Sequence, residues 1–155
     1  MTIDCLNPQG TLVPVPAARI TFRPAAYGLH IDGDRIVLQR DQHTGLWHPP
    51  GLIVPPGQVP RQALCAALHD LLRFDPLPGP LLLSEQQYRL DKEGDAWHLL
   101  LLYYYVSRST GALSQPGAGP EAETPEWVPL SDVTHQKMHF GYAAVRAARY
   151  RIAPA

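Results

Sequence analysis

The sequence predicts one α+β domain in which helices pack on a mixed β-sheet. An apolar and aromatic run at residues 97–107 is typical of a central strand that is buried on both faces. Apolar residues recur at helical spacing after Pro60, and a second such segment lies at 140–152. Strand-like segments joined by short turns accompany these two helices. That order of elements favours a sheet sandwiched between helices.

The remaining strands are expected beside turn signals. Asp32-Gly33-Asp34 is a hairpin signal, and Pro49-Pro50-Gly51 forms a sharp corner. The expected strands are residues 27–31, 35–40, 52–54, 81–83 with 86–90, and 126–130. Prolines cluster at 14 and 16, at 49–60 and at 76–80, where they mark edges, turns or helix starts.

The middle helix is expected to run from Pro60 to about Phe74, before Pro76. Proline suits the first turn of a helix because its missing N–H would have no partner there. The apolar positions that repeat at helical spacing are Leu64, Ala67, Leu68, Leu71 and Leu72.

Composition limits the class of protein. The chain has 155 residues, of which 45% are apolar and 17% charged, with a net charge of −1. We therefore expect a single domain over 1–155, with no nucleic-acid partner, because such binding needs a basic surface. The longest apolar run, 99–106, is far shorter than the ~20 residues of a membrane helix. No leader pattern precedes it, so we expect a cytoplasmic protein without membrane contact, in which Cys5 and Cys65 stay reduced.

The central part of the chain resembles the Nudix hydrolase family, also called MutT-like. The residues that carry the resemblance are the hairpin, Gly45-x-Trp47, the Pro50-Gly51 corner with the loop and helix after it, and Glu126-Trp127-x-Pro129-Leu130. Together they cover about residues 23–133. The resemblance implies a Nudix-type α/β/α sandwich around a mixed sheet. It also implies the box G-x5-E-x7-R-E-U-x-E-E-x-G-U, which brings glutamates to divalent metal ions and binds a diphosphate.

Carried over position by position, this box is degenerate. The box glycines fall on Leu52 and Arg73, and the glutamates and arginine fall on Gln58, Ala66, Ala67, Asp70 and Leu71. Only Asp70 keeps a carboxylate, so it is the one weak metal position, and no residue is a firm catalytic candidate. Magnesium needs several oxygen ligands in near-octahedral geometry. Ala67 and Leu71 offer none.

Two functional hypotheses follow, and a third stays open. In the first, the domain has lost Mg-dependent hydrolysis, needs no cofactor, and binds a nucleotide-like small molecule or a protein partner; a homodimer is also left open. In the alternative, it hydrolyses a nucleoside diphosphate derivative with Mg or Mn held by Asp70 and acids outside the box. Those acids are Glu85, Glu121, Glu123 and Glu126. In the third, histidines perform acid–base chemistry on the same scaffold.

Four residues are candidates for ligand binding. Trp47 and Gly51 stand at the corner that leads into the box loop, although Trp47 could instead fill the gap between sheet and helix. Tyr103 and Tyr105 share one strand face, opposite Tyr104, although packing is the simpler role for each. His135 and His139 are four residues apart and could share a helical face as zinc ligands do. Solvated histidines at a helix entry are the simpler interpretation.

Overall fold

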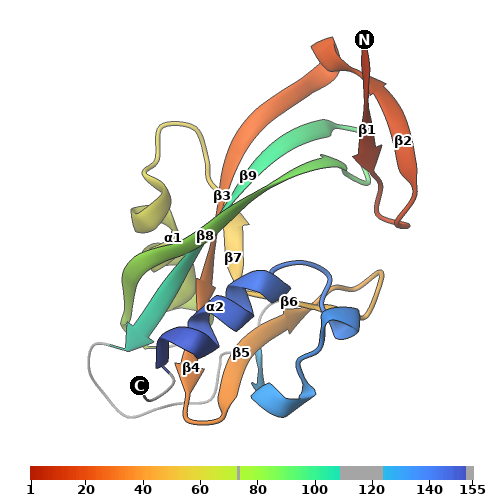
Figure 1. The fold of residues 1–155 in the computed structure, drawn as a ribbon. Helices are drawn as coiled ribbons and strands as arrows, with labels where there is room; N and C mark the ends of the chain where they lie inside the picture. Colours follow the sequence, from red (N-terminus) through yellow and green to blue (C-terminus); the bar gives the residue numbers. More distant parts are fainter. Residues whose placement is uncertain (73, 109–123, 153–155) are drawn as a thin grey trace.

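The structure is a computed structural model that describes residues 1–72, 74–108 and 124–152 (Figure 1). The elements are β1 (Thr2–Leu6), β2 (Leu12–Pro16), β3 (Ile20–Leu29), β4 (Ile31–Asp32), β5 (Arg35–Arg40), β6 (Trp47–His48), β7 (Gly51–Ile53), α1 (Pro60–Leu72), β8 (Pro76–Leu90), β9 (Ala96–Arg108), β10 (Glu126–Pro129) and α2 (Tyr142–Ile152). Short 3-10 turns lie at Ala17–Arg19, Leu130–Asp132 and His135–Lys137. The helices and most of the expected strands are confirmed, with ends that differ by a few residues.

The strands form a mixed sheet of six strands and a smaller second sheet. The large sheet has the order β2-β1-β8-β9-β3-β7, and the second has the order β10-β5-β4 with β6 paired to β5. The pairs β3–β9 and β1–β8 are parallel, while the other pairs in the large sheet are antiparallel. β9 lies between β8 and β3, which confirms the central strand predicted from its apolar run.

Alternation along β3 and β9 divides the core between the two helices. Ala25, Tyr27, Leu29, Leu99, Leu101 and Tyr103 pack with Ala144, Val145 and Ala148 of α2. Ala26, Tyr104 and Val106 pack with Ala63, Leu64, Leu68 and Leu72 of α1. Successive residues of a strand point to opposite faces, so α1 and α2 cover opposite faces of the large sheet (Figure 1). This is the expected α/β/α sandwich.

α1 approaches the sheet closely because β3 has a glycine beneath it. A Cβ at Gly28 would lie 2.8 Å from a methyl of Leu68 and 2.9 Å from one of Val106. Leu68 and Leu72 are fully buried, as helical spacing predicts for the core face. The helix ends at Leu72, slightly before the predicted end, and Phe74 packs on the ring of His30 at 4.9 Å.

The N-terminal hairpin β1–β2 was not predicted. It extends the large sheet through one parallel contact, in which Leu6 of β1 pairs with Arg89 of β8, and it projects from the body of the fold (Figure 1). The N–H of Ala17 donates to the carbonyl of Met1 at 3.0 Å. Because donors alternate along an antiparallel strand, the positions of Pro14 and Pro16 face outward. Two prolines therefore close the outer edge of β2 without losing a hydrogen bond of the sheet.

Candidate functional site

The positions of α1 and its preceding loop that we aligned with the Nudix box carry few polar side chains. Ala67 and Leu71 are half-buried, whereas Ala66 and Gln58 are exposed. The side chain of Asp70 is 90% exposed and lies 3.7 Å from the imidazole of His69, which also lies 3.3 Å from Asp75. The apolar box positions Leu68 and Phe74 are buried, as the assumed register requires.

Of the acids proposed to help Asp70, the two that the structure describes, Glu126 and Glu85, lie on other elements and are engaged elsewhere. Glu126 on β10 accepts hydrogen bonds from the indole N–H of Trp47 at 2.6 Å and from Arg40 at 3.1 Å. Glu85 pairs with Leu101 on the sheet face that α2 covers, opposite α1, and burial raises the pKa of its carboxyl. Glu121 and Glu123 lie outside the described residues, as does Arg73.

The donor set of the described residues does not fit a divalent metal ion. Nowhere in 1–72, 74–108 or 124–152 do three His, Cys, Asp or Glu side chains converge closely enough to hold one. Ala67 and Leu71 have no oxygen to offer, and magnesium binds through oxygen ligands. The prediction that His135 and His139 could share a helical face is wrong, because the 3-10 turn that begins at His135 ends at Lys137, before His139. The two imidazoles therefore share no helical face.

Trp47 and Gly51 both have structural roles in this fold. The indole of Trp47 bonds to Glu126, the guanidinium of Arg40 lies 4.9 Å from its ring centroid, and its backbone pairs with Met138. A Cβ at Gly51 would lie 2.0 Å from the carbonyl oxygen of Ala26 on the neighbouring strand, so the β3–β7 pairing requires glycine there. Ligand binding by either residue stays a prediction.

Tyr103 and Tyr105 share a face, as their spacing predicts, and that face is packed. Tyr103 is fully buried, 5.9 Å from the ring of Tyr27, and its hydroxyl finds no hydrogen-bond partner in the part of the chain that is described. Burial, with a smaller effect from nearby Glu85, raises the pKa of that hydroxyl far above its usual value. Tyr105 lies under the guanidinium of Arg151 of α2 at 5.6 Å. Neither side chain lines the cleft beside the N-terminal hairpin.

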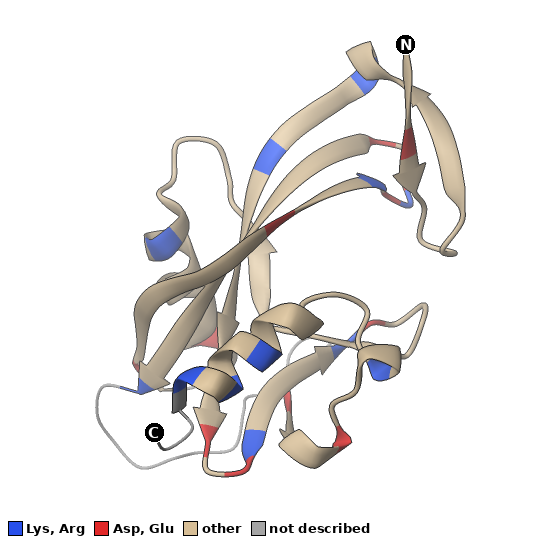
Figure 2. Ribbon diagram, in the orientation of Figure 1, with Lys and Arg blue, Asp and Glu red and all other residues tan. Residues whose placement is uncertain are grey.

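A cleft of about 290 Å³ lies where the N-terminal hairpin meets the loops of the second sheet. This volume is just below the range of about 300–1,000 Å³ that is typical of small-molecule sites. Its walls are Leu6, Asn7, Pro8, Asp41, His43, Ile53, Arg89, Leu90, Asp91, Lys92, Trp97, Leu99 and His139. Figure 2 shows charged positions of both signs where β8 meets β9 beside this hairpin. This cleft was not predicted from the sequence, because its residues come from six separate segments of the chain.

The two carboxylates of the cleft, Asp41 and Asp91, already accept hydrogen bonds from the protein. Asp91 accepts the N–H groups of Glu93 at 3.0 Å and Asp95 at 2.8 Å, and the indole N–H of Trp97 at 3.0 Å. Burial alone would raise the pKa of Asp91, but these hydrogen bonds outweigh it and lower the pKa. Asp41 is likewise buried in part, and hydrogen bonds from Thr44, together with His139 and His43, lower its pKa.

The cations of the cleft, Arg89 and Lys92, have no acidic partner in the part of the chain that the structure describes. The Nε of Arg89 donates to the side-chain oxygen of Gln87 at 2.7 Å, and its guanidinium lies 4.6 Å from the ring centroid of Phe140. One terminal nitrogen of Arg89 is buried without a hydrogen-bond partner among the described residues. Within the same residues, neither Arg89 nor exposed Lys92 forms an ion pair. Asp41 and Asp91 keep their negative charges, so the carboxylates and the cations of the cleft balance in number, and Arg89 and Lys92 are its charged hydrogen-bond donors.

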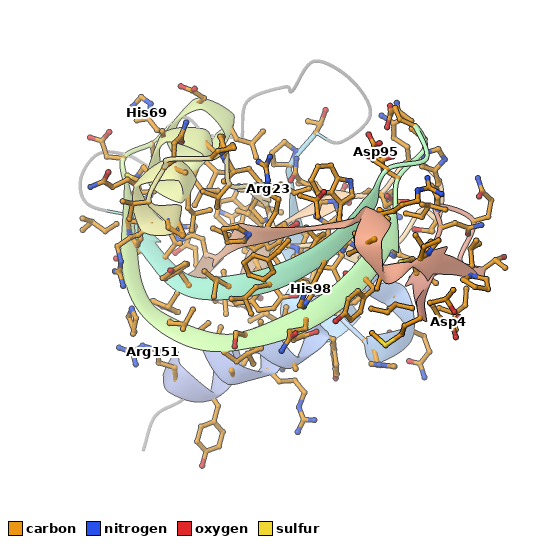
Figure 3. The ribbon with its side chains drawn as sticks, turned by 90° about the horizontal axis from the view of Figure 1, so that it is seen from above. Asp4, Arg23, His69, Asp95, His98 and Arg151 are labelled. Atoms are coloured by element: carbon orange, nitrogen blue, oxygen red, sulfur yellow. The ribbon has the colours of Figure 1, made fainter. Side chains whose placement is uncertain are left out.

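The cleft and the end of α1 that carries Asp70 lie far apart. His69, next to Asp70 in sequence, is at one side of the molecule, and Asp4 of the N-terminal hairpin is at the other (Figure 3). Within the described residues, neither helix is long and apolar enough to cross a membrane.

Comparison with solved structures identifies the fold. No family model matches the sequence, and no curated protein matches it either. The E. coli ORF135 protein superimposes with a TM-score of 0.63 at 21% identity, over 91% of this chain and 100% of its own. A Nudix hydrolase from Nitrosomonas europaea has a TM-score of 0.59 at 10% identity, over 84% of this chain and 90% of its own.

A third similar structure was solved with a ligand. The Nudix domain of Shewanella oneidensis NrtR, in complex with ADP-ribose, has a TM-score of 0.60 at 16% identity, over 86% of this chain and 89% of its own. All three likenesses extend over most of the chain. The chain has the Nudix fold.

Proposed function

We propose that this protein binds a nucleotide-like small molecule in the cleft and does not hydrolyse diphosphates with magnesium. The observation that carries the proposal is the cleft itself. It combines apolar walls at Leu6, Ile53 and Leu99 with the indole of Trp97 and two unpaired cations. Small-molecule sites have this character, with apolar and aromatic walls and a few polar groups that orient the ligand. A nucleotide offers a planar ring and an anionic group to match.

The composition of α1 supports binding over hydrolysis. Activating water against a diphosphate usually needs carboxylates that hold one or more metal ions. Among the described residues, Asp70 is the single carboxylate at a box position, and it is largely exposed beside His69. We therefore expect the protein to need no metal cofactor.

Hydrolysis of a nucleoside diphosphate derivative is the second candidate. It is favoured by the similar structures that are described as hydrolases, such as the one from Nitrosomonas europaea. It would need Mg or Mn held by Asp70 together with Glu121 or Glu123, which lie outside the described residues. Loss of activity in Asp70→Asn would support it.

Calorimetric titration with ADP-ribose and a panel of nucleoside diphosphates tests the proposal. Ile53 is 42% exposed in the cleft, so Ile53→Glu should leave the fold intact while placing a negative charge beside the ligand. Val59, 53% exposed and outside the cleft, gives the matched control Val59→Glu. We expect Ile53→Glu to raise the Kd about tenfold or more and Val59→Glu to leave it unchanged. No binding by the wild type up to about 1 mM would refute the proposal.

A further inference from the structure

The polar groups of the cleft differ in whether they are free to meet a ligand. Asp91 accepts hydrogen bonds from its own loop and from Trp97 through both oxygens, and Asp41 accepts three from His43 and Thr44 through Oδ2. Arg89 and Lys92 have no carboxylate partner in the described residues. Among the described residues, a ligand that enters the cleft therefore meets two cations without an ion-pair partner and two carboxylates that already accept hydrogen bonds.

Arg89 is held in place before any ligand arrives. Its Nε bonds to Gln87, its guanidinium rests on the ring of Phe140, and its residue pairs directly with Trp97 in the β8–β9 ladder. A side chain that is already ordered loses little further entropy on binding. A partly buried guanidinium without a counter-ion also gains more from an anion than an exposed one does.

The charges of Arg89 and Lys92 offer a way to bind phosphate although α1 has no cluster of metal ligands. In enzymes that act on phosphates, a divalent ion commonly neutralises the phosphate oxygens. Arginine and lysine neutralise phosphate directly through charge-assisted hydrogen bonds. The described chain offers such side chains in the cleft and offers no cluster of metal ligands.

We propose that the cleft holds the anionic group of its ligand directly on Arg89 and Lys92, without a divalent metal ion. This inference rests on the proposed function, because it assigns the chemistry by which the same cleft selects its ligand. The group it takes is a phosphate, which can belong to a nucleotide or to free pyrophosphate. Trp97, Leu99 and Ile53 then contact the less polar part of a larger ligand.

Titrations in EDTA test this directly. We expect ADP-ribose to bind in EDTA and its Kd to be no lower when magnesium is added. Uncharged adenosine should bind at least about tenfold more weakly, because hydrogen bonds to charged groups contribute most of the affinity. Inorganic pyrophosphate should compete with ADP-ribose, which separates recognition of the anion from recognition of the ring.

Variants assign the effect to particular side chains. Arg89→Met keeps an unbranched side chain over Phe140 and removes the charge, so the Kd for ADP-ribose should rise about tenfold or more while that for adenosine stays the same. Lys92 is exposed, so Lys92→Met should raise the Kd for ADP-ribose only about threefold. The control is Lys137→Met, because Lys137 lies by Trp47 outside the cleft. Lys137→Met should leave the Kd values for ADP-ribose and adenosine unchanged.

The outcomes separate this inference from the proposed function. ADP-ribose that binds only with magnesium, or that binds Arg89→Met and Lys92→Met as tightly as the wild type, would overturn the inference and leave the proposed function standing. Failure of every nucleotide to bind would overturn the proposed function. If Arg89→Met does not fold, wild-type affinity must still weaken between low salt and about 0.2 M NaCl. Affinity that is insensitive to salt would contradict the inference.

Discussion

Restoring the missing glutamates tests whether α1 occupies the register of the Nudix helix. The variant Gln58→Glu/Ala67→Glu/Leu71→Glu adds three carboxylates around Asp70. Positions 67, 70 and 71 are three and four residues apart and so lie on one side of the helix. The structure agrees with this register, because Leu68 between them is fully buried while Ala67 and Leu71 lie at the margin of the core.

The expected cost follows from that placement. Leu71 is half-buried, so losing its packing costs about 1–2 kcal/mol. Each new like-charge pair with Asp70 adds a few tenths of a kcal/mol. A total of about 2–3 kcal/mol should lower the Tm by about 5–10 °C in EDTA for a chain of this length. Manganese at about 100 times its Kd would return about 2.7 kcal/mol, and therefore most of that loss.

The assay is thermal unfolding followed by circular dichroism, in EDTA and in millimolar MnCl₂. The wild type and Gln62→Glu, an exposed change on the same helix about two turns from Asp70, serve as controls. We expect manganese to raise the Tm of the triple variant alone. A folded triple variant whose Tm responds to manganese no more than the wild type does would show that the box is wrongly aligned on α1. The description of this helix as a Nudix helix without its ligands would then be abandoned.

Three further predictions concern single residues. Gly51→Ala places a Cβ 2.0 Å from a backbone carbonyl oxygen of β3 and should cost about 3 kcal/mol in chemical denaturation; Gly57→Ala, whose Cβ meets open space at a φ of 81°, should cost about 1 kcal/mol. Burial lowers the pKa of His30, so its neutral form stabilises the fold above the usual histidine pKa of about 6.5, and this contribution is lost as the pH falls below that value. Between neutral pH and about pH 5, the unfolding free energy of His30→Phe should therefore fall less than that of the wild type. An equal fall in the two proteins would contradict this. Trp47→Phe removes the hydrogen bond to Glu126 and should cost about 1 kcal/mol with no change in the Kd for ADP-ribose; a tenfold weaker Kd would instead make Trp47 a ligand residue.

Local patterns in the sequence predicted the elements with strong periodicity. The helical spacing after Pro60 gave α1, and the apolar run at 97–107 gave the central strand β9. Asp32-Gly33-Asp34 gave the β4–β5 hairpin, in which Gly33 has a φ of 63°. Such signals lie within a few residues of one another, so one sequence is enough to interpret them.

The elements that were missed depend on partners distant in the sequence. Pro14 and Pro16 indicated an edge, a turn or a helix start without distinguishing them, and Leu12–Pro16 is an edge strand whose prolines stand where the N–H would face outward. β8 begins at Pro76, five residues before the expected strand, because its pairing with β9 continues through a bulge beyond Leu81. Neither register is visible until the neighbouring strand is known.

The candidate site likewise combines features that local sequence patterns predict with features that depend on residues distant in the sequence. The degenerate box is a prediction from the sequence, because it depends on residue types at fixed spacing. The cleft could not be predicted in this way, because Leu6, Arg89 and His139 become neighbours only through the packing of the hairpin, β8 and the loop before α2. Trp47 and Tyr103 stood out by residue type, yet the fold bonds the first to Glu126 and buries the second.

The most direct test of binding without hydrolysis follows the ligand itself. The protein is incubated with ADP-ribose and either magnesium or manganese, at concentrations where calorimetry shows the site to be occupied, and the nucleotides are separated by chromatography. The account predicts that ADP-ribose is recovered intact, with no AMP formed above the protein-free control. Catalytic formation of AMP that is lost in Asp70→Asn would contradict it and show that the hydrolytic site survives.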